Sequence, residues 1–261
     1  MTALSHGESG DAIRGRTALV TGAGSGLGRA ISIALAGAGA RVILVGRSPS
    51  TLEHVRSEIP GSRVAICDIS DPAAVDTLTD ELTGETISIL VNNAGVPGPV
   101  APLTDVRPAD WDAVFATNVR GVYLMCRAFL PPMIERRDGH IINLSSVSGK
   151  RPLAGRTPYT ASKMAVIGLS TTLAHEVGLY GIAVNTLSPG PVRGPRMSRN
   201  FTLDAELHGT SYQEVERAFV SRSALQRLIE EDEVGAAVLA MLRMPGMTGA
   251  DVDLSAGMVA R

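Results

Sequence analysis

A tyrosine and a lysine four residues apart are the first side chains in this sequence whose pairing could carry chemistry. On a helix, Tyr159 and Lys163 would project from one face, which brings the ammonium close to the phenol. An unperturbed tyrosine has a pKa of about 10, so it needs a nearby cation to exchange protons near neutral pH. The chain has only two lysines, Lys150 and Lys163, so a chance pair is rare. The spacing indicates an acid/base tyrosine; a half-buried tyrosine beside a solvated lysine is the alternative.

Two serines precede this pair at the end of a β-branched apolar run. The run covers 140–144, and Ser145 and Ser146 follow it directly, with Ser146 thirteen residues before Tyr159. The carboxyl ends of parallel strands are where α/β sheets bind ligands. We therefore expect the serine hydroxyls and the Tyr159 phenol to meet at one site.

A glycine-rich segment, TGAGSGLG at 21–28, links the first apolar run to an amphipathic helical pattern. Its glycines follow the spacing T-G-x-x-x-G-x-G, with Gly22, Gly26 and Gly28 at the fixed positions. Such glycines let the backbone approach a pyrophosphate, which then lies at the helix N-terminus. No lysine follows them, which excludes an ATPase-type phosphate loop. The alternative is a plain glycine-rich turn between strand and helix.

The end of the second apolar run bears on the choice of dinucleotide. NAD sites usually place a carboxylate there to hold the ribose 2′-hydroxyl. This sequence reads Val-Gly-Arg-Ser at 45–48, with no carboxylate, and Arg47 could pair with a 2′-phosphate. NADP(H) is therefore favoured and NAD(H) remains open, with a solvated Arg47 as the alternative.

The elements that must position these residues alternate between short apolar runs and longer segments of helical period. Near-continuous β-branched runs indicate strands buried on both faces of a parallel sheet. Strand–helix alternation of this kind predicts an α/β fold, a doubly wound (Rossmann) seven-stranded parallel sheet with helices on both faces. The expected strands are 17–20, 41–45, 63–67, 87–91, 140–144, 182–187 and 250–254.

Composition restricts the class of protein. The chain has 261 residues, of which 44% are hydrophobic and 19% charged, so it can bury a large core. A formal charge of −2 gives no basic surface for nucleic acid or an anionic membrane. No signal-peptide pattern or apolar run of membrane-spanning length is present. Two cysteines and five unclustered histidines offer no disulfide framework or metal site. We expect a soluble cytoplasmic protein that binds small molecules.

The chain is expected to form one domain over 14–261 after a flexible N-terminal arm at 1–13. The segment 189–229 interrupts the alternation of strands and helices, and its length suits a lid over the substrate. Arg193, Arg196 and Arg199 would share a helical face at its start and could bind an anionic substrate group. A solvated basic face that pairs with Asp204 and Glu206 is the alternative.

Seven motifs in order make the chain resemble the short-chain dehydrogenases/reductases, in their single-domain branch, over about 14–261. They are TGAGSGLG at 21–28, Asp68, NNAG at 92–95, Asn118, the serines at 145–146, YTASK at 159–163 and SPGPV at 188–192. The sequence departs from the family pattern at Gly194, where many relatives have a threonine that bonds the carboxamide. It also departs at 254–257, where LSAG replaces V-D-G-G near the expected subunit contact.

The resemblance implies a role for each matched position. Tyr159 would be the acid/base, Lys163 its charge partner and a ligand of the nicotinamide ribose, and Asn118 the holder of a water beside Lys163. Ser146 would hydrogen-bond the substrate oxygen, with Ser145 as second choice. The implied cofactor-binding residues are Gly22, Ser25, Gly26, Leu27, Gly28, Arg47, Asp68, Ile69, Asn93, Ala94, Gly95, Tyr159, Lys163, Pro189, Gly190 and Val192.

The function implied is NAD(P)-dependent, reversible hydride transfer between the nicotinamide and a carbonyl or secondary alcohol, by a homo-oligomer (dimer or tetramer). One alternative is a non-catalytic dinucleotide-binding regulator on the same fold, which would be expected to lack the serine, tyrosine or lysine. A sugar-nucleotide epimerase of the longer branch is disfavoured, because the chain is too short for its extra substrate domain.

Overall fold

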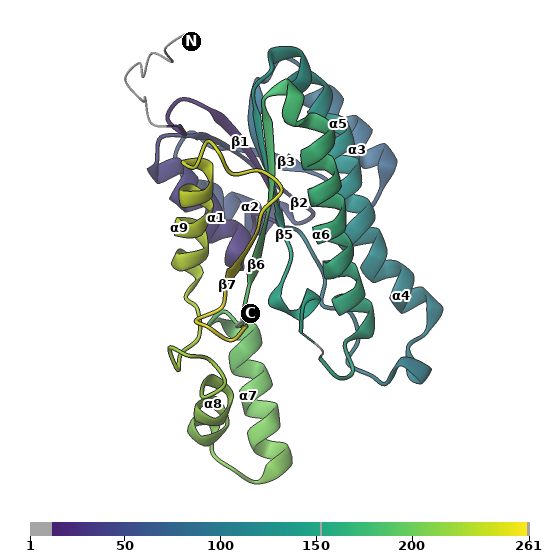
Figure 1. Ribbon diagram of the computed structural model, residues 1–261, viewed down its shortest axis with the longest axis vertical. Coiled ribbons are helices and arrows are strands. Elements are labelled where there is room, and N and C mark those ends of the chain that lie inside the picture. Colours follow the sequence, from purple (N-terminus) through teal and green to yellow (C-terminus); the bar gives the residue numbers. More distant parts are fainter. Residues whose placement is uncertain (1–11, 152, 260–261) are drawn as a thin grey trace, which may run out of the picture.

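The computed structural model describes residues 12–151 and 153–259 (Figure 1). The N-terminal arm expected over 1–13 lies, up to residue 11, outside the described residues. Ile13, the last residue of that expected arm, is fully buried in the core beside the sheet. A single apolar residue has no periodicity, so this contact cannot be predicted from the sequence.

The fold is built on one parallel sheet, as the alternation of apolar runs predicts. Its strand order is β3-β2-β1-β4-β5-β6-β7, so the chain winds outward from β1 in one direction and from β4 in the other. The strands are β1 (Thr17–Thr21), β2 (Arg41–Gly46), β3 (Arg63–Ile66), β4 (Ile87–Asn92), β5 (Gly139–Leu144), β6 (Ile182–Pro189) and β7 (Asp251–Leu254). This arrangement confirms the predicted doubly wound fold and brings the loops after β1, β4, β5 and β6 to one edge.

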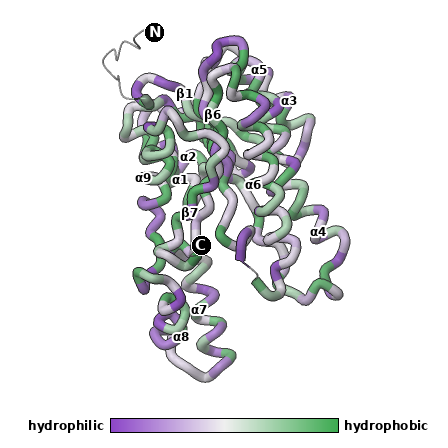
Figure 2. The backbone as a smooth tube through the Cα atoms, viewed as in Figure 1, coloured by the Kyte–Doolittle hydropathy of each residue, from purple (hydrophilic) through white to green (hydrophobic). Residues whose placement is uncertain are grey.

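Helices cover both faces of the sheet (Figure 1). One face carries α1 (Gly26–Gly37), α2 (Pro49–Glu58) and α9 (Glu231–Leu242). The other carries α3 (Pro72–Glu81), α4 (Pro108–Phe115), α5 (Gly121–Arg136) and α6 (Thr157–Val177). Figure 2 shows that hydrophobic residues follow the strands and alternate with hydrophilic ones along the helices, as amphipathic covers of a buried sheet require.

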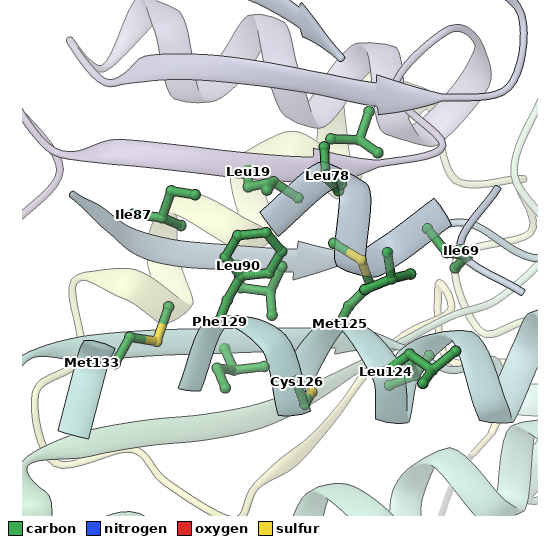
Figure 3. Packing of buried hydrophobic residues seen from close by; sticks show 14 of the residues in the cluster. Leu19, Ile69, Leu78, Ile87, Leu90, Leu124, Met125, Cys126, Phe129 and Met133 are labelled. Atoms are coloured by element: carbon green, nitrogen blue, oxygen red, sulfur yellow. The ribbon is translucent and has the colours of Figure 1, made fainter. Parts of the chain in front are cut away.

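Two hydrophobic cores hold these layers together, one on each face of the sheet. In the core under α5, Met125 and Phe129 point toward the sheet, where they meet Leu90 of β4 (Figure 3). All three side chains are at most 4% exposed. Burial of side chains of this size is worth about 1.5–3 kcal/mol each, so the cores fix the strand ends that carry the site.

The segment 189–229 forms two helices, α7 (Pro195–His208) and α8 (Tyr212–Val220), which project beyond the carboxyl ends of the strands (Figure 1). Phe201 joins them, because its ring contacts those of Tyr212 and Phe219 at centroid distances of 5.7 and 5.2 Å. A parallel bridge between Val192 and Ile229 closes the base of the segment.

The prediction that three arginines share a face of this segment is wrong. Arg193 precedes α7 and forms salt bridges of 2.9 Å with both Glu216 and Glu230. Arg199 is exposed on α7, and the side chain of Arg196 lies outside the description. Helix α7 begins at Pro195, so the i, i+3, i+6 spacing does not start inside a helix.

Candidate active site

The glycine-rich loop after β1 is shaped by two close backbone approaches. A Cβ atom on Gly28 would lie 2.1 Å from the carbonyl oxygen of Gly22, so only glycine fits there. Gly22 and Gly26 have φ of +65° and +52°, in the left-handed region that favours glycine. Ser25 caps α1 without a side-chain hydrogen bond, and the first turn contains no acidic residue. The first N–H groups of α1 can therefore receive an anion.

The loop after β4 is tied to this glycine loop by hydrogen bonds. The Thr21 hydroxyl accepts from the backbone N–H groups of Asn93 (3.0 Å) and Ala94 (3.1 Å). In return, Asn93 Nδ2 donates to the carbonyl oxygens of Thr21 (2.9 Å) and Gly22 (3.3 Å). These contacts hold the ends of β1 and β4 as one unit, which would give a bound dinucleotide a rigid edge.

The loops after β2 and β3 bring Arg47 toward Asp68. Arg47 Nη1 lies 3.8 Å from Asp68 Oδ2, and the Arg47 side chain is 68% exposed. Asp68 Oδ1 accepts from the hydroxyl and the N–H of Ser70, at 2.7 and 3.0 Å. The Ser70 hydroxyl bond, then the Ser70 N–H and Arg47, lower the pKa of Asp68 below its ordinary value. Asp68 is thus a fixed anion, whereas Arg47 is loosely held. The adjacent Ile69 is buried against Gly121.

The two serines after β5 have different surroundings. The Ser145 hydroxyl is buried and donates to the backbone carbonyl of Lys163 at 2.7 Å. The Ser146 oxygen accepts from the N–H of Ser148 at 3.1 Å, so its own proton remains available. Ser146 also lines the same cavity as Tyr159. The structure therefore separates a structural serine from one that can bind substrate.

Two cations lie close to the Tyr159 ring, Lys163 on α6 and Arg156 at the N-cap of the same helix. Lys163 Nζ is 5.8 Å from the ring centroid and donates to the carbonyl oxygen of Leu144 at 2.7 Å. Arg156 Cζ is 6.0 Å from the same centroid, and its Nη1 donates to the carbonyl oxygen of Pro97 at 3.2 Å. Lys163 is 5% exposed, so its charge acts on the phenol through a region with little water.

Asn118 is fully buried in a π-helical turn, Ala116–Arg120, between α4 and α5. Its amide exchanges two hydrogen bonds with the backbone of Val96, at 2.8 and 3.0 Å. It also donates to the Ser162 hydroxyl on α6, at 3.0 Å. A Cβ atom on Gly95 would lie 3.2 Å from Asn118 Oδ1 and 3.5 Å from Lys163 Nζ. The predicted residues Gly95, Asn118 and Lys163 therefore lie together.

The segment after β6 packs tightly against the C-terminal strand. The Gly190 N–H donates to the Leu254 carbonyl at 2.7 Å, and a Cβ atom on Gly190 would lie 2.9 Å from the Cα of Ser255. Pro189 ends β6, and Val192 bridges to Ile229. The predicted segment thus reaches the cavity through Gly190.

A cavity of about 610 Å³ lies between the strand ends and the helices of 189–229. Ser146 and Tyr159 line it from one side, Gly190 and Pro191 line it after β6, and Phe201 lines it from α7. A volume of this size suits a small organic molecule. The arrangement places the Ser146 hydroxyl and the Tyr159 phenol, whose ring has two cations nearby, at one concave site.

Comparison with known proteins identifies the family. The family model described as short chain dehydrogenase matches residues 16–206. The chain belongs to the short-chain dehydrogenase/reductase family. It is an oxidoreductase that acts on an alcohol or carbonyl carbon, and enzymes of this family use NAD(P)(H).

Relatives of this short-chain dehydrogenase/reductase carry related names. The chain is 40% identical to D-threitol dehydrogenase of Mycolicibacterium smegmatis over 181 residues, 67% of this chain and 69% of that protein. It is 35% identical to levodione reductase of Leifsonia aquatica, with 87% of each chain covered. A solved structure titled short chain dehydrogenase/reductase family protein has 31% identity and a TM-score of 0.83, covering 94% of this chain and 97% of that one. Within the described residues, no helix is long and apolar enough to cross a membrane.

One contact beside the site of this short-chain dehydrogenase/reductase is not predicted by the sequence. Lys150 ends the short 3₁₀ turn that follows Ser146, and its side chain is 4% exposed. Its Nζ lies 2.8 Å from Asp251 Oδ2 and also contacts Asp253, both on β7. The Ser188 hydroxyl donates to the other oxygen of Asp251 at 2.6 Å. The scarcity of lysine was the available signal, but nothing local in the sequence indicates a partner 101 residues away.

Proposed function

We propose that this enzyme transfers a hydride reversibly between NADP(H) and a carbonyl or secondary alcohol of a small molecule, with Tyr159 as the acid/base. One observation carries the proposal. Ser146 and Tyr159 line the same cavity, and the buried ammonium of Lys163 lies beside the Tyr159 ring. A hydroxyl donor, a proton carrier and a fixed cation are the groups that a carbonyl reduction needs from a protein.

The glycine loop fits the cofactor. The close approach of Gly28 to Gly22 leaves no side chain between the backbone and a pyrophosphate, and the start of α1 is uncapped by any side chain. Asn93, Ala94 and Gly95 would line the same edge, with Asp68 and Ile69 at the adenine end. When bound, the dinucleotide would supply or accept the hydride.

Each side chain at the cavity would have a separate role in the reaction. The Ser146 hydroxyl would donate to the substrate oxygen and orient it. Tyr159 would give its proton to that oxygen during reduction and take it back during oxidation. Lys163 would stabilise the phenolate by its charge. Asn118, with its amide bound to Val96 and Ser162, would hold α6 against the loop after β4. The predicted water relay beside Lys163 stays a prediction.

The position of Arg47 favours NADP(H) over NAD(H) as the cofactor. The end of β2 offers no carboxylate to a ribose 2′-hydroxyl, and Arg47 is exposed and only loosely paired at 3.8 Å from Asp68. An exposed guanidinium that can turn toward a 2′-phosphate would form a charge-assisted contact with it. Use of NAD(H) remains the second candidate.

Helices α7 and α8 are proposed to act as the substrate lid, since both contribute residues to the cavity. A single domain over 14–261, homo-oligomerisation and a cytoplasmic location, all expected from the sequence, also stay predictions. Light scattering coupled to size-exclusion chromatography measures the oligomeric state directly.

The decisive experiment measures nicotinamide absorbance with a panel of ketones and alcohols, each cofactor, and the Tyr159→Phe variant. We expect turnover to fall by a factor of at least about 10² in this variant, while NADPH affinity is kept. Tyr123→Phe is the matched control, because Tyr123 lies on α5 outside the described cavity lining. Near-normal turnover in Tyr159→Phe contradicts the proposed mechanism. Dinucleotide binding without turnover of any substrate would instead indicate the non-catalytic regulator.

A further inference from the structure

The outer part of the cavity is unusually apolar for solvent-accessible surface. Leu153 lines it from the loop before α6, and Leu203 and Leu207 line it from α7. These three leucines are 49%, 52% and 77% exposed, and Val100, a fourth lining residue, is 73% exposed. Large apolar side chains gathered around one opening indicate a surface that a ligand covers.

Two arginines accompany this apolar surface without a carboxylate partner. Arg151 and Arg222 both line the cavity, and neither forms a salt bridge within the part of the chain that the structure describes. Arg193 and Arg227, at the base of the same segment, are by contrast each bound to glutamates. Asp204, the acidic residue of the described lining, lies 3.3 Å from His208.

We infer that the substrate is amphipathic, with an apolar body and an anionic group, such as a carboxylate, remote from the reacting carbon. This inference rests on the proposed function, because it places the reacting oxygen at Ser146 and Tyr159. The leucines would cover the apolar body. Arg151 and Arg222, whose guanidinium groups are unpaired by carboxylates, would bind the anion.

A neutral polyol fits poorly against the apolar part of the cavity that Leu153, Leu203 and Leu207 line. Each hydroxyl of a polyol placed against Leu153, Leu203 or Leu207 would lose a hydrogen bond to water and gain none from the protein. Away from Ser146 and Tyr159, uncharged polar side chains of the described lining are few, chiefly Ser148 and Asn200. An alkyl chain placed against the same leucines loses no hydrogen bond, so the cavity should select against sugar alcohols.

The test compares two ketones that differ in one group, 7-oxooctanoate and 2-octanone, with ribitol as the polyol. In the wild-type enzyme, we expect kcat/KM for reduction of the carboxylated ketone to exceed that for 2-octanone by about tenfold. With the oxidised cofactor, we expect ribitol to be oxidised more slowly than the two corresponding alcohols. This ratio between the two ketones should fall toward one in Arg151→Gln or Arg222→Gln. Arg199→Gln is the matched control, since Arg199 is exposed on α7 and outside the described lining.

The ratio is measured within each variant, so partial loss of folded protein cancels. Equal kcat/KM for the two ketones in the wild type overturns the inference, and so does a preference that both arginine variants keep. Faster oxidation of ribitol than of the corresponding alcohols also overturns it.

A binding measurement separates this inference from the proposed function. Calorimetric titration of 7-oxooctanoate into NADPH-saturated Tyr159→Phe enzyme needs no turnover. Affinity that falls about tenfold when Arg151→Gln is added supports the inference even if neither ketone is reduced. Affinity that is unchanged overturns it, whereas absence of turnover in the wild type counts against the proposed function alone.

Discussion

Lys150 and Asp251 are separated by one hundred residues of sequence and form a buried salt bridge of 2.8 Å. This bridge joins the turn after Ser146 to the last strand of the sheet, and the Ser188 hydroxyl extends it to β6. The side of the cavity that Ser146 lines is thus held to the far edge of the sheet by a charge that water hardly reaches.

Removal of Lys150 should destabilise the fold strongly. Lys150→Met would leave Asp251 and Asp253 partly buried without their cation, which typically costs about 3–5 kcal/mol of unfolding free energy. Urea denaturation followed by circular dichroism measures this loss. The control is Arg107→Met, which breaks an exposed pair with Asp110 and should change stability little. Equal effects of the two substitutions would show that burial does not strengthen the Lys150 bridge.

Gly28 should tolerate no side chain. In Gly28→Ala the methyl group would meet the Gly22 carbonyl at 2.1 Å and the Asn93 amide at 2.6 Å, and both are fixed by the loop. We expect a loss of about 1–3 kcal/mol in stability and a sharp rise in the Kd for NADPH. In the control, Gly37→Ala, the new methyl has no neighbour within 4 Å and should stabilise α1 by up to about 1 kcal/mol. Normal NADPH binding by Gly28→Ala would contradict the proposal that the glycine loop at 21–28 binds the pyrophosphate.

The two adjacent serines should respond differently to alanine. Ser146→Ala removes the donor that faces the cavity, so kcat should fall by about 10²–10³ with little change in stability. Ser145→Ala leaves the buried carbonyl of Lys163 without its 2.7 Å hydrogen bond. It should lower stability by about 1–3 kcal/mol. Steady-state kinetics and thermal denaturation of both variants check the assignment, and the opposite pattern would exchange the two roles.

Arg47 should govern the choice of cofactor. We expect the wild type to bind NADPH more tightly than NADH, by a factor of roughly ten to one hundred, because a partly shielded Arg–phosphate contact is worth about 1–3 kcal/mol. Arg47→Ala should weaken NADPH binding and leave the Kd for NADH unchanged. Arg56→Ala, on the exposed face of α2, is the control. If the wild type binds NADH more tightly than NADPH and Arg47→Ala leaves both Kd values unchanged, Arg47 is only a solvated surface residue.

His140 should make the fold sensitive to mild acid. Burial, with a smaller effect of Arg16, lowers the pKa of His140 to about 4, and its Nδ1 lies 3.0 Å from Arg16 Nη1. The unfolded ring has an ordinary pKa of about 6.5, so the unfolded state binds more protons between these values and stability falls as the pH falls. From pH 7 to 5 this amounts to about 2 kcal/mol. Urea denaturation should show a smaller loss in His140→Asn, whereas His54→Asn, at an exposed site, should match the wild type.

The sequence by itself determined where the strands lie along the chain and the local chemistry of the motifs. Apolar runs and helical stripes depend on periods of two to four residues, so they predicted all seven strands and the alternation of strands with helices. The glycine loop and the Tyr159–Lys163 pair are likewise short-range, since each lies within one turn or one helix. Their conformations follow from backbone sterics and helix geometry, which local sequence controls.

Only the tertiary structure decided which residues share the cavity. It distinguished Ser146 from Ser145, which local spacing left as neighbours, because the distinction depends on where α6 passes. It also turned Arg193 to glutamates outside the cavity and brought Arg151 and Arg222 into it. Contacts such as that of Lys150 with Asp251 depend on how helices and strands pack across the sheet. Packing is a property of the whole chain, so no short stretch of sequence specifies such pairs.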